Sequence, residues 1–237
     1  MPIGRRRNRI DRSLRERGVP PEPQVRVREV DETTGPWDET DVPDDGLARI
    51  DLGALRLPAL AGMELRVEVG PQGQVVGATL RDGESLLSVA AFAAPRAGGL
   101  WDDVREEIHR SASGQGGSLK DRQGPFGTEL AGTVLALPAV PEGTNPQPIR
   151  VPARFLGVDG PRWFLRGTIT GPAGAGGESA AALEQAFRDV VVVRGTEPMP
   201  VRDPLPLTLP AQAAEQMAAQ LEEQQAAQQQ AGGPTPA

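Results

Sequence analysis

The chain has 237 residues, a formal net charge of −7, 29 glycines and 24 prolines, and only 3% aromatic residues, so it is not globular throughout. It has no cysteine and one histidine, which excludes disulfide scaffolds, thiol nucleophiles, Cys-based metal centres and multi-His metal sites. No apolar run reaches the roughly 18 residues of a transmembrane helix.

Residues 1–46 are predicted to be disordered, because they are polar, charged and rich in proline. An acidic linker with eight acids and no base covers residues 29–45. A basic arm precedes it, with seven arginines: Arg5, Arg6, Arg7, Arg9, Arg12, Arg15 and Arg17. The arm could bind nucleic acid, lie on an anionic lipid surface, or fold back on the acidic linker. The arginines are not followed by the apolar stretch of a secretory signal, so we expect a cytoplasmic protein.

A single folded domain is predicted from Leu47 to residue 209, and it begins with strands. A first strand is expected over 48–57. Residues 63–69 alternate apolar and charged side chains, which indicates a half-buried strand. A turn at 70–73 and a strand over 74–81 follow. Asp82-Gly83 is a hairpin signal, and the strand over 85–92 is apolar on both faces, as expected at the centre of a sheet.

A helix, further strands and a second helix are predicted after these first strands. A helix is expected from Leu100 to about Ser113, and strands over 118–123 and 127–137. A hairpin around Asp159-Gly160 joins strands over 149–158 and 162–170, and Pro152 favours an edge position for the first of them. A last helix is predicted from an N-cap at Ser179 to a stop at Gly195. Its apolar stripe would contain Leu183, Ala186, Phe187, Val190 and Val191.

These elements predict an α+β fold, with a mostly antiparallel sheet and two main helices. The remaining residues, 210–237, form a tail rich in Ala and Gln, a low-complexity composition.

Several features that could suggest catalysis have simpler interpretations. Four acids open the middle helix, Asp102, Asp103, Glu106 and Glu107, and their expected role is to face water and complement the helix dipole. His109 has no nucleophile motif near it. The glycine-rich strings at 114–117 and 171–177 lack the phosphate-loop ending and are interpreted as flexible connectors. No catalytic residue, metal site or cofactor is therefore predicted.

Four arginines on the predicted hairpin are more informative. Arg150 and Arg154 alternate onto one face of their strand, and Arg162 and Arg166 do so on the next strand, beside Trp163. Guanidinium groups beside an aromatic ring suit the binding of an anion or the stacking of a base. The register of the two strands decides whether the four share a face, and the alternative is a solvated face with cation–π packing.

Four strings carry a resemblance to a known family. They are Gly-Pro-Trp-Asp at 35–38, Gly-Pro-Phe-Gly-Thr-Glu-Leu at 124–130, Gly-Val-Asp-Gly-Pro-Arg-Trp-Phe-Leu-Arg-Gly at 157–167 and Phe-Arg-Asp-Val-Val-Val-Val-Arg-Gly at 187–195. From about residue 35 to 209 the chain resembles the actinobacterial family called domain of unknown function 3710. The resemblance brings no established activity, cofactor or catalytic residue. The order of strands and helices is also similar to the Mog1/PsbP-like sandwich, a fold used mostly for binding.

Three functions follow as hypotheses. The first is a non-catalytic binding module whose partner is expected to be a protein. The second is a protein that associates with nucleic acid through the arginine arm. The third is an enzyme acting on a nucleotide or phosphorylated substrate. It is suggested by the hairpin arginines and by the resemblance, whose family's genes often lie near a deoxyuridine triphosphatase gene.

Overall fold

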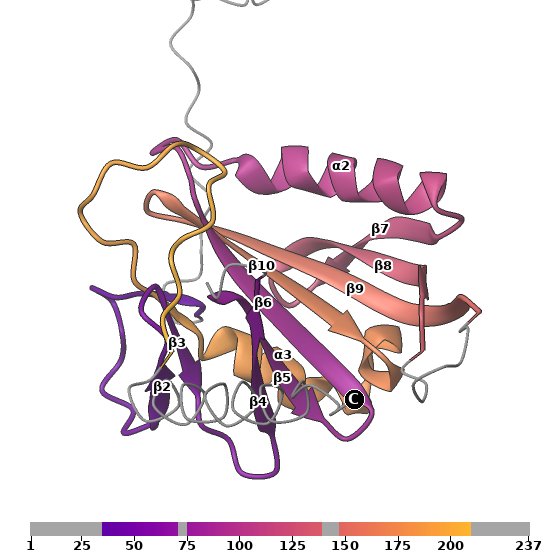
Figure 1. Ribbon diagram of the computed structural model, residues 1–237, viewed down its shortest axis with the longest axis horizontal. Coiled ribbons are helices and arrows are strands. Elements are labelled where there is room, and N and C mark those ends of the chain that lie inside the picture. Colours follow the sequence, from indigo (N-terminus) through magenta and orange to yellow (C-terminus); the bar gives the residue numbers. More distant parts are fainter. Residues whose placement is uncertain (1–34, 71–74, 139–146, 210–237) are drawn as a thin grey trace, which may run out of the picture.

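The computed structural model describes residues 35–70, 75–138 and 147–209 (Figure 1). The elements in chain order are β1 (Trp37–Asp38), β2 (Arg49–Asp51), β3 (Leu55–Pro58), β4 (Glu64–Val69), β5 (Val75–Asp82), β6 (Ser85–Ala93), α2 (Leu100–Gly114), β7 (Ser118–Gly124), β8 (Gly127–Ala136), β9 (Ile149–Gly160), β10 (Trp163–Thr170), η1 (Pro172–Ala175), η2 (Glu178–Ala180), α3 (Ala181–Arg188) and β11 (Val191–Val192). Strands dominate and two helices accompany them, so the predicted α+β class is confirmed.

The main feature is a seven-stranded antiparallel sheet with the order β4-β5-β6-β10-β9-β8-β7. The predicted strands over 63–93 and 118–170 are all present within one or two residues of their expected bounds. Strand β6 lies between β5 and β10, as its apolar composition predicted. The two hairpin turns are shifted by one or two residues, because Asp82 pairs with Ser85 and Gly160 pairs with Trp163.

The edge position predicted from Pro152 is wrong, because β9 lies between β10 and β8. Pro152 is opposite Thr133 of β8, but β10 ends at Thr170, opposite Ala153. One side of the strand is therefore unpaired at Pro152, and a residue without an N–H group is tolerated there.

The large sheet is covered differently on its two faces. Every second residue of β6, including Leu87, Val89 and Ala91, is buried in the main core with α3 and the short strands. The intervening residues lie on the same side of the sheet as α2, and Phe92 among them packs against the cluster that contains Trp101 and Phe164. Figure 1 shows α2 running along the β7–β9 side of the sheet. On this side of the sheet α2 packs mainly on β7, β8 and β9, and it does not extend over β4 and β5.

A second, four-stranded sheet has the order β1-β11-β3-β2. The strand expected over 48–57 is instead two short strands, β2 and β3. Strand β1 pairs in parallel with β11, so the first strand of the described residues begins at Trp37, ten residues before the predicted domain start. The predicted turn at 70–73 falls mostly on residues 71–74, which are outside the described residues, as are the basic arm and the 210–237 tail.

The last helix is shorter than predicted. It spans Ala181–Arg188, and neither Ser179 nor Gly195 caps it. Val190 and Val191 are fully buried, as the apolar stripe suggested, but Val191 belongs to strand β11. Four consecutive β-branched residues favour a strand over a helix at this point. The string 171–177 is likewise not a loose connector, since it contains the 3-10 helix η1 and Ala173 is buried.

Three contacts hold α2 against the sheet. The carboxylate of Asp159 accepts hydrogen bonds from the N–H groups of Leu100 (3.1 Å) and Trp101 (3.5 Å) at the start of the helix. The indole Nε1 of Trp101 donates to the Thr128 carbonyl at 2.6 Å. The ring of Trp101 fills the space that a Cβ of Gly157 would take, 2.2 Å from Trp101 Cδ2. The glycine therefore allows the close approach.

None of the helices in the described parts of the chain has both the length and the hydropathy needed to cross a bilayer.

Candidate binding groove beside α2

The four hairpin arginines do not gather at one site. Arg154 is opposite Ile169 on β10, and its side chain lies on the α3 face of the sheet. Arg166 is opposite Gly157 and lies on the α2 face with Phe92. The register thus sends the two arginines to opposite faces of one hairpin.

Arg154 belongs to a buried ion network. Its side chain is 1% exposed, and it donates to both oxygens of Glu129, at 3.0 and 2.8 Å. It also donates to Glu184, which stands on α3, at 2.5 Å. Burial by itself lowers the pKa of the Arg154 guanidinium, but the hydrogen bonds and charges of Glu129 and Glu184 reverse this and raise that pKa above its usual value. Glu129 also pairs with Arg122 at 2.6 Å, so the network joins β7, β8, β9 and α3 and has a structural role.

The other predicted hairpin residues have separate surroundings. Trp163 is buried and its Nε1 donates to Asp38 Oδ2 at 2.6 Å, which ties β10 to the segment around β1. Arg162 occupies the hairpin turn with a φ of 61°, and its carbonyl accepts from Ala94 N and Arg194 Nε. Arg150 is exposed near the start of β9. None of the three contributes to a common anion site with Arg166.

Arg166 differs from Arg154 in having no polar partner. Within the described residues it forms no hydrogen bond and no ion pair. Its guanidinium carbon lies 5.3 Å from the centre of the Phe92 ring, a cation–π contact. Burial lowers the pKa of the Arg166 guanidinium, and the charge of Glu68 raises it in part. An arginine stays protonated at any physiological pH, so the structure holds a half-buried cation without a paired anion.

A row of stacked rings leads from this cation to α2. Phe92 stacks on Phe164, and Phe164 stacks on Trp101, each at 6.0 Å between ring centres. These rings form the second apolar cluster of the protein, with Val104, Ile108 and Phe155 packed against it. The cluster is therefore the floor and inner wall of the space beside the helix.

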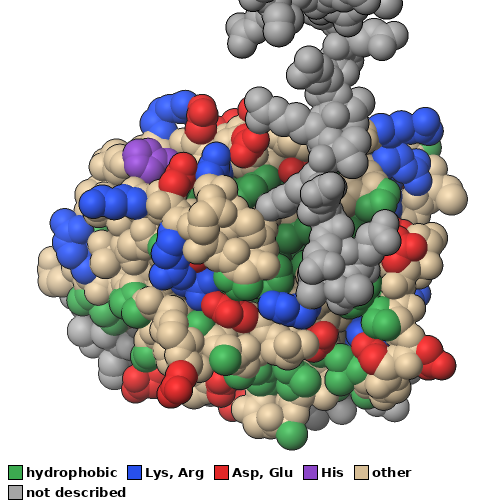
Figure 2. Space-filling view, turned by 180° about the vertical axis from the view of Figure 1, so that it is seen from behind, with side chains coloured by type: hydrophobic (Ala, Val, Ile, Leu, Met, Phe, Trp, Pro, Cys, Tyr) green, Lys and Arg blue, Asp and Glu red, His purple; other side chains and the backbone are tan. Residues whose placement is uncertain are grey.

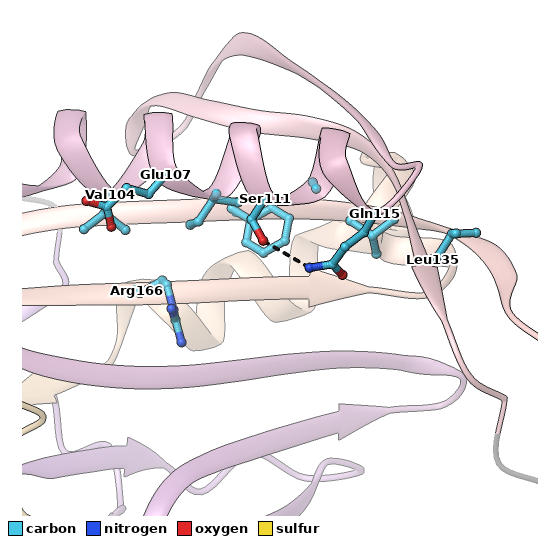
Figure 3. Close-up of a pocket in the computed structure, with 10 residues that line it drawn as sticks. Val104, Glu107, Ser111, Gln115, Leu135 and Arg166 are labelled. Carbon is cyan, nitrogen blue, oxygen red and sulfur yellow. Dashed lines mark hydrogen bonds between the residues drawn. The ribbon is translucent and has the colours of Figure 1, made fainter.

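That space is a groove of about 430 Å³ between α2 and the sheet. Its lining from α2 includes Val104, Ile108 and Ala112, which lie one turn apart on the same side of the helix, and Phe155 and Arg166 line it from the sheet. In Figure 3 the side chains of Val104, Ser111 and Gln115 point from α2 toward the strands, whereas Arg166 points away from the helix. A smaller hollow of about 180 Å³ continues it past Arg166 toward Leu100, and Arg166, Val104 and Glu107 line both.

The rim of the groove carries an ion pair that the sequence did not indicate. Glu107 accepts from Arg202 at 2.6 Å, and Arg202 Nη2 lies 3.4 Å from Asp103. Arg202 has a φ of 75° and belongs to the segment that crosses from β11 back to the sheet. The acids of α2 therefore hold a distant segment in addition to facing water. In the described parts of the chain, no group of three His, Asp or Glu side chains is arranged to hold a metal ion.

The remaining sequence candidates lie elsewhere. His109 is exposed on the opposite side of α2, beside a shallow hollow of about 700 Å³ that Arg110 and Lys120 also line. Figure 2 shows side chains of both charges spread over the other side of the molecule, with hydrophobic ones between them. The seven arginines of the basic arm are outside the described residues.

Sequence reasoning singled out Arg166 but missed the rest of the groove. The apolar spacing of Leu100, Val104 and Ile108 was visible, and it predicted only the buried side of a helix. The spacing continues to Ala112, and this extension was the available signal for a longer apolar wall. Nothing in the sequence places Phe92 beside Arg166, because that contact depends on the pairing of β6 with β10.

The comparisons with known proteins identify the family and no activity. The chain matches the family described as "Protein of unknown function (DUF3710)" over residues 35–216, and it belongs to that family. A search of curated proteins found no match. A crystal structure from Bacteroides thetaiotaomicron VPI-5482 is similar at 16% identity, with a TM-score of 0.35. The match covers 62% of this chain and 48% of that one, so the chain spans about half the length of that protein.

Proposed function

We propose that this protein is a non-catalytic binding module and that its binding surface is the groove between α2 and the large sheet. The observation that carries the proposal is the unpaired, half-buried guanidinium of Arg166 beside an apolar groove. A cation in such a place costs free energy unless an anion or water compensates it, and binding sites are where proteins retain such groups. Its action in the cytoplasm stays a prediction from the sequence.

The shape and lining of the groove agree with a binding role. Its volume falls within the range of about 300–1,000 Å³ that is typical of small-molecule sites, and its lining is mostly apolar with few polar groups. Trp101 and Asp159 fix α2 on the sheet, so the groove is present before a ligand arrives. A preformed groove avoids the ordering cost of a flexible one.

The proposal can be tested without knowing the ligand. We would record amide shifts of ¹⁵N-labelled full-length protein with a mixed set of neutral and charged aromatic fragments. Shifts are expected at residues around the groove, among them Ile108, Ser111, Phe155 and Arg166. Replacement of Ala112 by Trp fills the groove and should abolish them, whereas Ser113→Trp on the neighbouring exposed position should not. The proposal fails if the shifts are absent or gather on another surface.

The two other functions keep only their sequence-based support. The nucleic-acid hypothesis rests on the arginine arm, and the enzyme hypothesis rests on the hairpin arginines and on the family resemblance. Since Arg154 and Arg166 lie on opposite faces, a joint substrate site for them is not supported by the geometry.

A further inference from the structure

We propose that the groove binds a small amphiphilic anion, with a single carboxylate or phosphate group at Arg166 and an apolar chain along α2. This inference rests on the proposed function and names the class of ligand. Three observations support it: the surroundings of Arg166, where the anionic head group would bind; the apolar side of α2, where the chain would lie; and the charges around both.

The head-group position is the guanidinium of Arg166. Its cross-strand neighbours are Ala90 on β6 and Gly157 on β9, which place only a methyl group and a hydrogen atom beside it, and its guanidinium lies over the ring of Phe92. One row further along, Thr168 pairs with Ser88, and both hydroxyls belong to the same face of the sheet. The Ser88 hydroxyl is hydrogen-bonded to Thr79 at 2.8 Å, and Thr79 itself donates to Glu68, so Thr168 is the neighbouring hydroxyl that we assign to the ligand. A guanidinium with a neighbouring hydroxyl donor matches the oxygens of a carboxylate or a phosphate.

The chain position is the apolar side of α2. From Val104 to Gln115 the helix rises about 16 Å, which gives the groove the length of a medium alkyl chain. Ile108 and Phe155 line its middle. Leu135, with 38% of its surface exposed, lines the far end. An apolar chain along this wall would cover hydrophobic surface that is otherwise open to water.

The surrounding charges favour one anionic group over several. Arg166 and Arg202 line the hollows beside the helix together with Glu107, whose carboxylate is already paired with Arg202. Glu68 acts on Arg166 through its charge, but it accepts a hydrogen bond from Thr79 at 2.9 Å. A ligand with several negative charges would be repelled by the carboxylates of Glu68 and Glu107. A cationic ligand would be repelled by the guanidinium groups of Arg166 and Arg202. A neutral chain would leave Arg166 without a counter-charge.

The test uses calorimetry on the full-length protein, with probes that share a ten-carbon chain and are kept below their micelle concentrations. They are decanoate, decyl phosphate, decanol and decyltrimethylammonium, with inorganic phosphate as the head group alone. Decanoate and decyl phosphate are expected to bind roughly 10- to 100-fold more tightly than decanol, the ratio of a charge-assisted hydrogen bond. Their relative affinity distinguishes a carboxylate ligand from a phosphate ester. Decyltrimethylammonium and inorganic phosphate should bind more weakly than either.

Three single substitutions test which side chains determine the preference for anionic probes. Arg166→Gln should remove the preference for the anionic probes and leave decanol binding unchanged. Glu68→Gln should tighten decanoate binding, because it removes a carboxylate whose negative charge acts at the position of Arg166. Arg110→Gln removes the same charge as Arg166→Gln on the outer side of α2 and should change nothing. If Arg166→Gln does not fold, the side-chain Nε–H resonance of Arg166 in the unaltered protein should shift on titration with decanoate.

The outcomes separate the two proposals. Equal binding of decanol and decanoate, or an Arg166→Gln variant that binds decanoate normally, overturns the inference while leaving a groove that binds apolar ligands. If fragments and all ten-carbon probes fail to shift the groove residues, the proposed function fails as well.

Discussion

Removal of the Glu129 carboxylate should strongly destabilise the protein. Glu129 and Arg154 are 2% and 1% exposed, and Glu129→Ala leaves the buried guanidinium with only one carboxylate, that of Glu184. Breaking a buried pair from one side costs about 3–5 kcal/mol. For a domain of this size that corresponds to a fall of about 6–20 °C in Tm. The free energy of unfolding would be measured by urea denaturation followed by circular dichroism, with the Tm from a thermal scan.

Two controls test the reasoning about burial. Glu64→Ala removes a carboxylate that is 66% exposed and pairs with Arg66, and it should cost less than about 1 kcal/mol. The double variant Glu129→Met/Arg154→Met removes both charges and should recover much of the loss. A Glu129→Ala variant no less stable than Glu64→Ala would show that water or a rearranged Glu184 compensates the charge, and would refute the argument.

Three further substitutions have expected outcomes. Gly157→Ala places a methyl group against the ring of Trp101 and should cost about 1–3 kcal/mol, with a change in near-ultraviolet circular dichroism as α2 shifts. Trp163→Phe keeps the ring packing but removes the indole donor to Asp38 Oδ2, and should lower the free energy of unfolding by about 1–3 kcal/mol in urea titrations. Arg202→Ala breaks exposed ion pairs, should barely change the free energy of unfolding, and should increase amide hydrogen exchange in the segment around it.

The large sheet could be predicted from sequence because local signals define it. Residues 63–69 alternate without a break, and turn residues separate each later pair of strands. Each hairpin pairs neighbours in the chain, so the pattern and the turns are sufficient. The one long-range pairing at its centre, β6 with β10, has no such signal. That pairing places Phe92 beside Arg166 and so creates the candidate site.

The short sheet was missed because its strands are too brief to show a period. Strands β1 and β11 have two residues each, and their pairing joins positions more than 150 residues apart. The valines at 190–193 continued the helical spacing of Leu183 and Phe187, so periodicity alone favoured a longer helix. Their β-branching and the tertiary pairing with β3 decide for a strand.

The string from Gly157 to Gly167 contains both residues that pack the fold and the arginine that we propose as a binding residue, and the alternation of a strand sends them to opposite faces. Gly157 and Gly167 have the rings of Trp101 and Phe187 where a Cβ would be, so these glycines permit packing on the two faces. Trp163 enters the main core, and Arg166, three residues later, emerges on the other face beside α2. Arg154 has two carboxylates within reach, whereas Arg166 has an aromatic ring and open space. Two arginines of one hairpin therefore differ in their surroundings: Arg154 is held by ion pairs within the fold, and Arg166 is the one that we propose contacts a ligand.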